Sequence, residues 1–449
     1  GNVGADNVLF GGHTDVNNRG YIYFSDPDGY VGIFSRTSGS ADINYASNAR
    51  FRDPTAWYHV VVSIDTTQAT AADRFKMYIN GEQYTDWGTE SAPSQNASLP
   101  ILNKAAQTVA AGYGASAVSS MSEGYLADFY YIDGQALHCG NFGEPDPDNP
   151  TIWRPKKYEG TFGSAGFKLE FKQTGTGTAG TGTIGADTSG NLNHLTSNNL
   201  ESINIVEDTP TNNFATLNPL DAQALNGTFS EGNCKITTPN NNHSFYASTM
   251  GVTSGKWYME FKIIDEAATG GANYAHVGVI SESGNHKDST ANSNSAGNEK
   301  LTFSQYNYGI AADNGKFTSN NQAGATYGAT WGDDNDIMSV ALDIDNNRVA
   351  FAKNGQWADG SGNYDESSPT GYGTIVAPSS TVLGAYFFAI GDNVSNGNDE
   401  SILVAAANFG NPPYSISSGN ADGNGYGNFE YAVPSDHYAL CTKNLAQYG

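Results

Sequence analysis

Residues 336–357 read DIMSVALDIDNNRVAFAKNGQW, and this stretch decides the fold class of the chain. Apolar residues alternate with polar or small ones along 338–344 and again along 349–353. Asp, Asn and Gly stand between and after these two arms, where the chain must reverse. A period of two is the pattern of a β-strand, and an Asn-Gly pair supplies the positive φ angles of a tight turn. The stretch therefore predicts a β-hairpin.

The composition of the whole chain is typical of an all-β protein. Its 449 residues include 53 glycines, and aromatic residues make up 12%. Such a length predicts two or three domains. We find no sustained helical period and no apolar run near the roughly 18–20 residues of a membrane span. We therefore expect an all-β fold of two antiparallel, jelly-roll-like β-sandwich domains, with no membrane span.

The charge of the chain excludes one class of partner. There are 46 acidic and 21 basic residues, which gives a net charge of −25. A surface of this sign repels the phosphate backbone, so we expect no nucleic-acid binding. The three cysteines (Cys139, Cys234 and Cys441) are far apart and show neither metal-ligand spacing nor a disulfide framework.

The first residues, GNVGADNVLF, lack a basic region and an apolar core, so we expect no signal peptide in them. They resemble the inside of a strand pattern, as in a segment cut from a longer polypeptide. A Gly/Thr/Ser tract, QTGTGTAGTGTIGADTSGNLNHLT, fills 173–196 and is typical of a linker. We therefore predict a first domain over 1–172, a linker over 173–204 and a second domain over 205–449.

In the first block, residues 57–83 read WYHVVVSIDTTQATAADRFKMYINGEQ. The β-branched run over 57–65 predicts a central strand buried on both faces, and 75–81 predicts an alternating strand that ends in an Asn-Gly turn. Together with GYLADFYYIDG at 124–134, these residues resemble the laminin-G/concanavalin-like lectin sandwich. The aromatic-rich opening strand that is usual in that family is absent.

The second block resembles the SPRY domain in five motifs that follow one another in the family's order. They are SGKWYMEFK (254–262), HVGVI (276–280), YGI (308–310), the hairpin at 336–357 and AAANFGNPPY (405–414). The resemblance implies a two-sheet sandwich that binds other molecules and is not known as a catalyst.

Three further phrases resemble large structural proteins of tailed bacteriophages, especially marine ones. These are DTSGNLN (187–193), DTPTNNFATLNPL (208–220) and ALCTKNL (439–445). The resemblance implies a virion surface or tail-fibre protein, located in the virion or outside the cell, that acts in display and attachment. Its partners would be other virion proteins and a host-surface glycan or protein, and it would form a homo-oligomer, with a trimer favoured. A glycan-degrading enzyme of sandwich fold and a secreted bacterial adhesin stay open as alternatives.

Sugar sites use aromatic planes with nearby amides, and several aromatic residues stand in expected loops. The candidates for ligand binding are Trp331, Trp357, Tyr327 and Tyr364, and beside them Tyr372 and Trp87. The alternative is that they cover the edge of a core.

Clusters of carboxylates in loops predict possible calcium sites, because Ca²⁺ prefers oxygen ligands. Asp26 and Asp28 form one cluster, and Asp333, Asp334 and Asp336 form another. Asp128 and Asp133 are a third pair. The alternative is that these side chains cap turns without a metal.

A glycosidase needs two carboxylates across a cleft, and the nearest candidates are Glu260 and the Asp265-Glu266 pair. Glu260 shares its strand face with Tyr258 and Lys262, so we expect it on a solvated side. No nucleophile elbow, phosphate loop or H-E-x-x-H helix is present in the sequence. We therefore expect no enzymatic activity.

Overall fold

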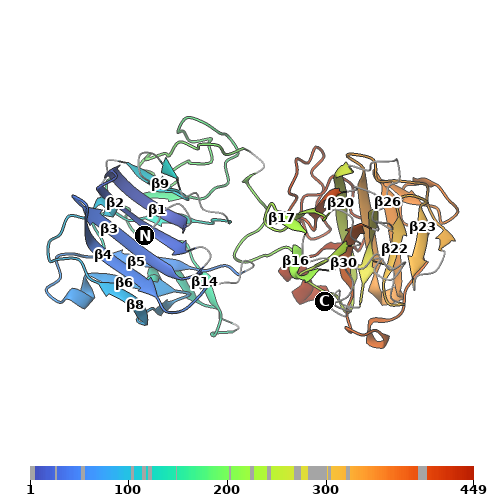
Figure 1. Cartoon of the computed structure of the whole chain (residues 1–449), viewed down its shortest axis with the longest axis horizontal. Coiled ribbons are helices and arrows are strands. Elements are labelled where there is room, and N and C mark those ends of the chain that lie inside the picture. Colours follow the sequence, from blue (N-terminus) through green and yellow to red (C-terminus); the bar gives the residue numbers. More distant parts are fainter. Residues whose placement is uncertain are drawn as a thin grey trace. The chain divides into compact units, whose positions relative to one another are not determined.

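The computed structural model divides into two compact units, residues 1–205 and 206–449, and each is described by itself (Figure 1). The residues that it describes are 6–25, 28–51, 56–102, 106–113, 118–119, 124–147, 149–201, 204–222, 227–239, 244–266, 275–281, 301, 305–319, 324–392 and 402–449. Both units consist of antiparallel sheets, apart from one short parallel pairing, so the prediction of an all-β fold is confirmed. No helix in these ranges is long and apolar enough to cross a membrane.

Unit 1 has a six-stranded sheet in the order β8-β4-β3-β2-β1-β9 and a three-stranded sheet in the order β5-β6-β7. Three two-stranded pairings, β10-β11, β12-β15 and β13-β14, complete its described strands. The bounds are β1 (Asp6–Asp15), β2 (Asn18–Ser25), β3 (Val31–Thr37), β4 (Ser40–Ser47), β5 (Val60–Ile64), β6 (Phe75–Ile79), β7 (Glu82–Gln83), β8 (Trp87–Ser91), β9 (Gln107–Val109), β10 (Gly112–Tyr113), β11 (Val118–Ser119), β12 (Phe129–Tyr131), β13 (Gly143–Pro145), β14 (Trp153–Pro155) and β15 (Phe167–Leu169), with 3-10 turns η2 (Ala71–Asp73), η3 (Pro100–Leu102) and η4 (Cys139–Asn141).

The core of unit 1 lies between these layers. Val31 and Ile33 of β3 pack with Phe75 and Met77 of β6, because alternate side chains of each strand point to the same face. The prediction that residues 57–65 form a central strand buried on both faces was wrong. Among the described residues β5 pairs with β6 alone, and only Val61 of its five residues is fully buried. The β-branched run therefore forms an edge strand of the smaller sheet.

The described part of the predicted linker, residues 173–201, is packed within unit 1. Ile184 and Ala186 are buried, and the boundary between the compact units follows residue 205. The buried carboxylate of Asp187 accepts hydrogen bonds from the backbone N–H groups of Lys168 (2.9 Å), Ser189 (2.8 Å) and Asn193 (2.8 Å). Hydrogen bonds thus fix a segment whose few apolar side chains could not order it alone.

Unit 2 contains two larger sheets. One has seven strands in the order β16-β19-β30-β21-β22-β23-β24, and the other follows the path β17-β18-β31-β20-β25-β26-β27-β28, with β29 beside β26 and β32 beside β20. The bounds are β16 (Leu217–Ala222), β17 (Thr228–Ser230), β18 (Lys235–Thr237), β19 (Ser244–Ser248), β20 (Lys256–Glu266), β21 (Ala275–Ile280), β22 (Tyr308–Ala311), β23 (Lys316–Ser319), β24 (Ala325–Thr326), β25 (Ile337–Asp343), β26 (Arg348–Lys353), β27 (Gln356–Ala358), β28 (Tyr364–Glu366), β29 (Gly373–Thr374), β30 (Phe387–Asp392), β31 (Leu403–Asn408) and β32 (Tyr438–Ala439), with 3-10 turns η6 (Ile344–Asn346) and η7 (Pro378–Ser380) and helix α1 (Thr442–Tyr448).

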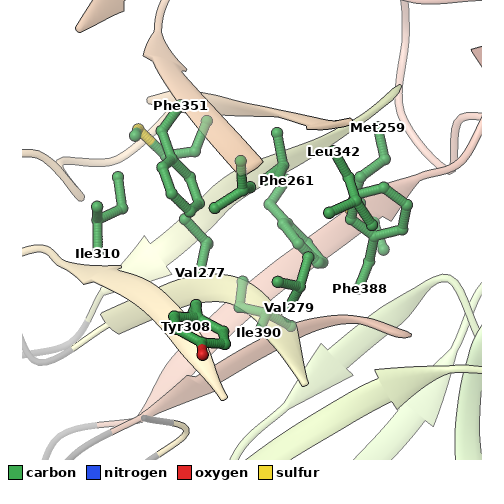
Figure 2. Close-up of a cluster of buried hydrophobic side chains, with 14 of the residues drawn as sticks. Met259, Phe261, Val277, Val279, Tyr308, Ile310, Leu342, Phe351, Phe388 and Ile390 are labelled. Carbon is green, nitrogen blue, oxygen red and sulfur yellow. The ribbon is translucent and has the colours of Figure 1, made fainter. Parts of the chain in front are cut away.

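The main core of unit 2 lies between its two sheets. Figure 2 shows Phe261 and Leu342 of the larger sheet among Val277, Phe388 and Ile390 of the smaller one. These five side chains are almost completely buried. Unit 2 is therefore a β-sandwich.

The predicted hairpin is present as β25 and β26. Val340 pairs with Phe351 in antiparallel register, and the Asn354-Gly355 turn has φ angles of 49° and 80°. One feature differs from the prediction, because every residue of β25 is buried rather than every second one. Residues 409–448, which we call the C-terminal cover, pack on the outer face of the larger sheet and bury the β25 side chains that point away from the main core. Its Phe429, for example, packs on Tyr258.

We expect Asp187→Ala to loosen the tract at 173–204, since three backbone N–H groups would lose their acceptor. An unsatisfied buried group costs on the order of 1–3 kcal/mol, and only the Lys168 N–H belongs to a buried residue while water can reach the other two in part, so unit 1 should lose stability by about 2–4 kcal/mol. Limited proteolysis of the full chain should cut the variant within 173–204 faster than the wild type. Thr188→Ala, at an exposed neighbour, is the control. Equal cutting rates for wild type and Asp187→Ala would contradict this account.

Candidate functional site

The four aromatic residues predicted to bind a ligand lie inside unit 2. Trp331 is 2% exposed, Tyr327 and Trp357 are also buried, and Tyr364 is partly buried. Tyr327, Trp331 and Tyr364 join the core between the sheets, whereas Trp357 packs beneath the C-terminal cover. Their rings are covered by protein, so they do not form the predicted ligand face.

Local contacts explain these positions. The hydroxyl of Tyr327 accepts a hydrogen bond from the Phe351 backbone N–H (3.1 Å), which holds the ring against the hairpin. The two further candidates also have structural contacts. Trp87 packs against Tyr45 with ring centroids 5.1 Å apart, and the Arg348 guanidinium lies 3.9 Å from the centre of the Tyr372 ring.

Those carboxylates predicted to bind calcium that the structure describes do not gather into a metal site. Asp26 lies outside the described residues, and Asp28, Asp333 and Asp334 are exposed. The side chain of Asp336 is buried, and its oxygens accept from the Gly332 N–H (2.9 Å), the Asp333 N–H (3.1 Å), Asn354 Nδ2 (2.8 Å) and Lys353 Nζ (3.0 Å). Within the described ranges no group of three or more His, Cys, Asp or Glu is placed to hold a metal ion.

The third predicted pair, Asp128 and Asp133, also contacts nearby groups of the protein. Asp128 lies 3.7 Å from Lys168 Nζ, and Asp133 accepts a hydrogen bond from the Ala165 N–H at 3.1 Å. Asp336 and Asp133 therefore stabilise loops through hydrogen bonds. This agrees with the alternative that these side chains cap turns without a metal.

The prediction of a solvated Glu260 was wrong, because this side chain is completely buried. It points to the outer face of the larger sheet, and the C-terminal cover closes over it. Each carboxylate oxygen accepts from several donors. Oε1 accepts from the Tyr431 N–H (2.8 Å) and Tyr258 Oη (3.0 Å), and Oε2 accepts from the Glu430 N–H (3.0 Å), Asn408 Nδ2 (3.2 Å) and Tyr414 Oη (3.5 Å).

Burial raises the pKa of Glu260 from 4.5 to about 7, and the hydrogen bonds from Tyr431 and Glu430 oppose part of this shift. A raised carboxyl pKa is common in catalytic acids. A catalytic acid must also reach its substrate, and here the donors and the cover occupy both oxygens. Asp265, the nearby second candidate, is exposed on the same strand and forms no facing pair with Glu260. The arrangement is that of an anchor for the cover.

The clearest exposed feature of unit 2 is a loop over residues 373–386, which we call the apolar loop. Val376 is 38% exposed, Val382 is 51% exposed and Leu383 is 39% exposed. Three exposed aliphatic side chains thus stand within eight residues of one another on a chain that is otherwise rich in polar residues. The sequence signal was the IV and VL pairs in GTIVAPSSTVLGAY, outside any expected strand.

The apolar loop is held firmly by hydrogen bonds at both ends. The Val376 N–H donates to Tyr308 Oη (3.2 Å), and Tyr386 Oη donates to the Val376 carbonyl (2.7 Å). Ser281 Oγ lies 2.5 Å from both Thr381 Oγ1 and the Ala385 carbonyl oxygen. A loop held in this way presents its side chains with little conformational entropy left to lose on binding.

Because the pKa of Glu260 is raised on folding, unit 2 should be more stable in mild acid than in mild base. The folded state binds more protons between pH 4.5 and about 7, so the free energy of unfolding should fall by on the order of 3 kcal/mol as pH rises through this window. Glu260→Gln should reduce this slope without abolishing it, because burial also raises the pKa of Asp208 in unit 2 to about 6. Glu231→Gln, at an exposed carboxylate of the same unit, should keep the full slope. Urea unfolding at pH 5 and pH 8 tests this, and an unchanged slope in Glu260→Gln would contradict it.

Comparison with known proteins gives matches among solved structures but none among family models or curated proteins. No family model matches the sequence, and no curated protein matches it. Among solved structures, the chain is similar to the SPRY domain of human HERC1, with 16% identity and a TM-score of 0.30, over 42% of this chain and 96% of that one. It is also similar to another human SPRY domain, with 13% identity and a TM-score of 0.27, over 42% of this chain and 97% of that one.

Proposed function

We propose that this chain is a non-enzymatic recognition protein that acts in display and attachment on a virion surface or tail fibre. The first unit would be the lectin-like module and the second unit the SPRY-type module. The five ordered motifs of the second block and the three phage-like phrases support this assignment. The chain would assemble with other virion proteins and would recognise a host-surface glycan or protein.

The observation that carries the proposal is the apolar loop. Its exposed side chains are aliphatic, and aliphatic groups gain free energy chiefly by leaving water, whereas sugar recognition favours aromatic planes. The loop is also fixed in place, which is typical of a preformed protein contact. The partner of this loop is therefore a protein, and within the proposal it is another protein of the particle.

The buried state of Glu260 supports a role without catalysis. Its two oxygens bind the backbone N–H groups of Glu430 and Tyr431, and the cover would have to leave before a substrate could approach. A carboxylate used in this way stabilises the fold. The glycan-degrading alternative would then need a pair of carboxylates elsewhere.

The location of the chain tests the proposal directly. Electron microscopy of particles labelled with a gold-conjugated antibody against the full chain should show label at tail fibres or on the particle surface. Cross-linking of intact particles should join the apolar loop to a second virion protein. Label on bacterial cell walls, with none on particles, would instead favour the adhesin alternative and would refute the virion assignment.

We expect Val382→Asp and Leu383→Asp to weaken assembly of the chain with its particle partner by at least about tenfold each. A charge placed in an apolar contact must be desolvated on binding, and losses of about 2 kcal/mol or more are usual at central contact residues. Co-sedimentation of purified chain with particles that lack it measures the effect. Leu220→Asp, at a side chain that is 82% exposed elsewhere in unit 2, should bind as the wild type does. Equal losses in all three variants would refute the loop as the contact.

We also expect no hydrolysis of polysaccharides by the full chain, because the buried carboxylate has no open cleft. A reducing-end assay over a panel of neutral and acidic polysaccharides should show no turnover above buffer. Turnover that disappears in Glu260→Gln, while that variant stays folded by circular dichroism, would establish the glycan-degrading alternative.

A further inference from the structure

Unit 1 carries a row of partly exposed aromatic side chains on the outside of its smaller sheet. We call Tyr125, Trp57, His59 and Trp153 the aromatic strip. Tyr125 is 36% exposed, and the other three are partly exposed. The rings of Tyr125 and Trp57 are stacked with centroids 6.4 Å apart and planes at 29°, and those of His59 and Trp153 are 6.1 Å apart.

The strip follows from the direction of β5. The β5–β6 ladder continues back to His59, because the Asn80 N–H donates to the His59 carbonyl at 2.9 Å. Alternate residues of an extended chain point to one face, so Trp57 and His59 lie on the same side as Val61. Val61 packs in the cluster outside the sheet that includes Trp153 and Tyr130. The strip therefore lies on the face of β5 that is turned away from the core of unit 1.

Two glycines hold the Trp153 ring flat against the backbone. A Cβ atom at Gly81 would lie 2.3 Å from Cε3 of this indole, and one at Gly143 would lie 2.5 Å from its Cε2. Any larger residue would push the ring away. At the other end of the strip, the exposed Tyr125 ring lies beside Trp57.

The strip is uncharged, although the chain as a whole is strongly acidic. Trp153 Nε1 donates to His59 Nδ1 at 3.0 Å, which places the proton of a neutral imidazole on Nε2. Burial lowers the pKa of His59 and favours this neutral form. The charges that border Trp153 are paired with one another, since Arg154 lies 2.9 Å from Glu144 and 3.7 Å from Asp146.

We propose that the aromatic strip binds a neutral oligosaccharide. Flat ring faces with a negative quadrupole match the polarised C–H faces of pyranose rings, and the His59 Nε2–H can donate to a sugar hydroxyl. Successive rings along one row suit an extended chain of sugars better than a single compact ligand. Among the described residues, the four side chains carry no charge of their own and the neighbouring Arg154 is paired with Glu144, which favours a neutral glycan over a uronic or sulfated one. This inference deepens the proposed attachment function and rests on it for its biological setting.

The experiment uses the purified full chain and a set of neutral, sialylated, uronic and sulfated oligosaccharides on one array. Neutral glycans should bind and the acidic ones should not. Binding of the best soluble neutral glycan, followed by tryptophan fluorescence, should change little between about 0.1 M and 1 M salt, because ring stacking involves no net charge. Binding of acidic glycans alone, or loss of binding at the higher salt, would overturn the inference.

Two variants connect the binding to the strip. Trp57→Ala and Tyr125→Ala should each weaken neutral-glycan binding by about ten- to a hundredfold, as removal of an anchor ring usually does. Because Tyr125 stacks on Trp57, circular dichroism should first show that both variants keep the wild-type fold. Leu220→Asp, at an exposed side chain of the other unit that lies in neither proposed surface, should bind glycan as the wild type does. Unchanged glycan affinity in a folded Tyr125→Ala variant and in Trp57→Ala would overturn the inference.

The outcomes separate this inference from the proposed function. If the array is empty for wild-type chain while particles carry the antibody label, the aromatic strip fails as a glycan site and the virion role stands. If neutral glycans bind through the strip while particles carry no label, the glycan site stands and the virion role fails.

Discussion

The packing of unit 2 depends on how the outer face of its larger sheet is covered. Every residue of β25 is buried, so this sheet would expose an apolar face without the C-terminal cover. Phe429 supplies side-chain contact, and Glu260 fixes the position of the cover through two consecutive backbone N–H groups. Burying a carboxylate costs several kcal/mol unless its lone pairs are satisfied, and here five donors satisfy them. The stability of the buried Glu260 carboxylate therefore depends on the C-terminal cover, and the covering of this sheet face depends in turn on Glu260.

This coupling explains why a buried, raised-pKa carboxylate here is not evidence of catalysis. Desolvation raises the pKa in catalytic and structural sites alike, so the shift alone does not distinguish them. Catalytic and structural carboxylates differ in which groups donate hydrogen bonds to them. At Glu260, two of them are main-chain N–H groups of a segment that would be displaced by a substrate. In a catalytic acid at least one oxygen must be left for the reacting group.

The sequence predicted those features that depend on local chemistry. The hairpin over 336–357 follows from alternation and an Asn-Gly turn, both of which act within a few residues. The burial of Glu260 was missed because it depends on segments that lie far away in the sequence, whereas the buried position of Trp331 agrees with the alternative that this ring covers the edge of a core. Alternation on β20 predicts one solvated face, which holds only for an antiparallel sheet with an uncovered side. The packing of residues 173–201 could not be read from their composition, since it depends on the hydrogen bonds of Asp187 and on only two buried apolar side chains, Ile184 and Ala186.

The two proposed contact surfaces share one physical requirement, which is set by charge. Unit 1 has 21 acidic and 12 basic residues, and unit 2 has 25 acidic and 9 basic ones. This field repels anionic surfaces at a distance and keeps the chain soluble, but it adds little affinity for a neutral partner. Affinity must then come from desolvated apolar or aromatic groups on rigid supports. The apolar loop meets this requirement through Val382 and Leu383, and the aromatic strip meets it through Trp57 and Tyr125. Because aliphatic and aromatic groups favour different ligands, the acidic surface can exclude anionic partners while each unit selects its own neutral one.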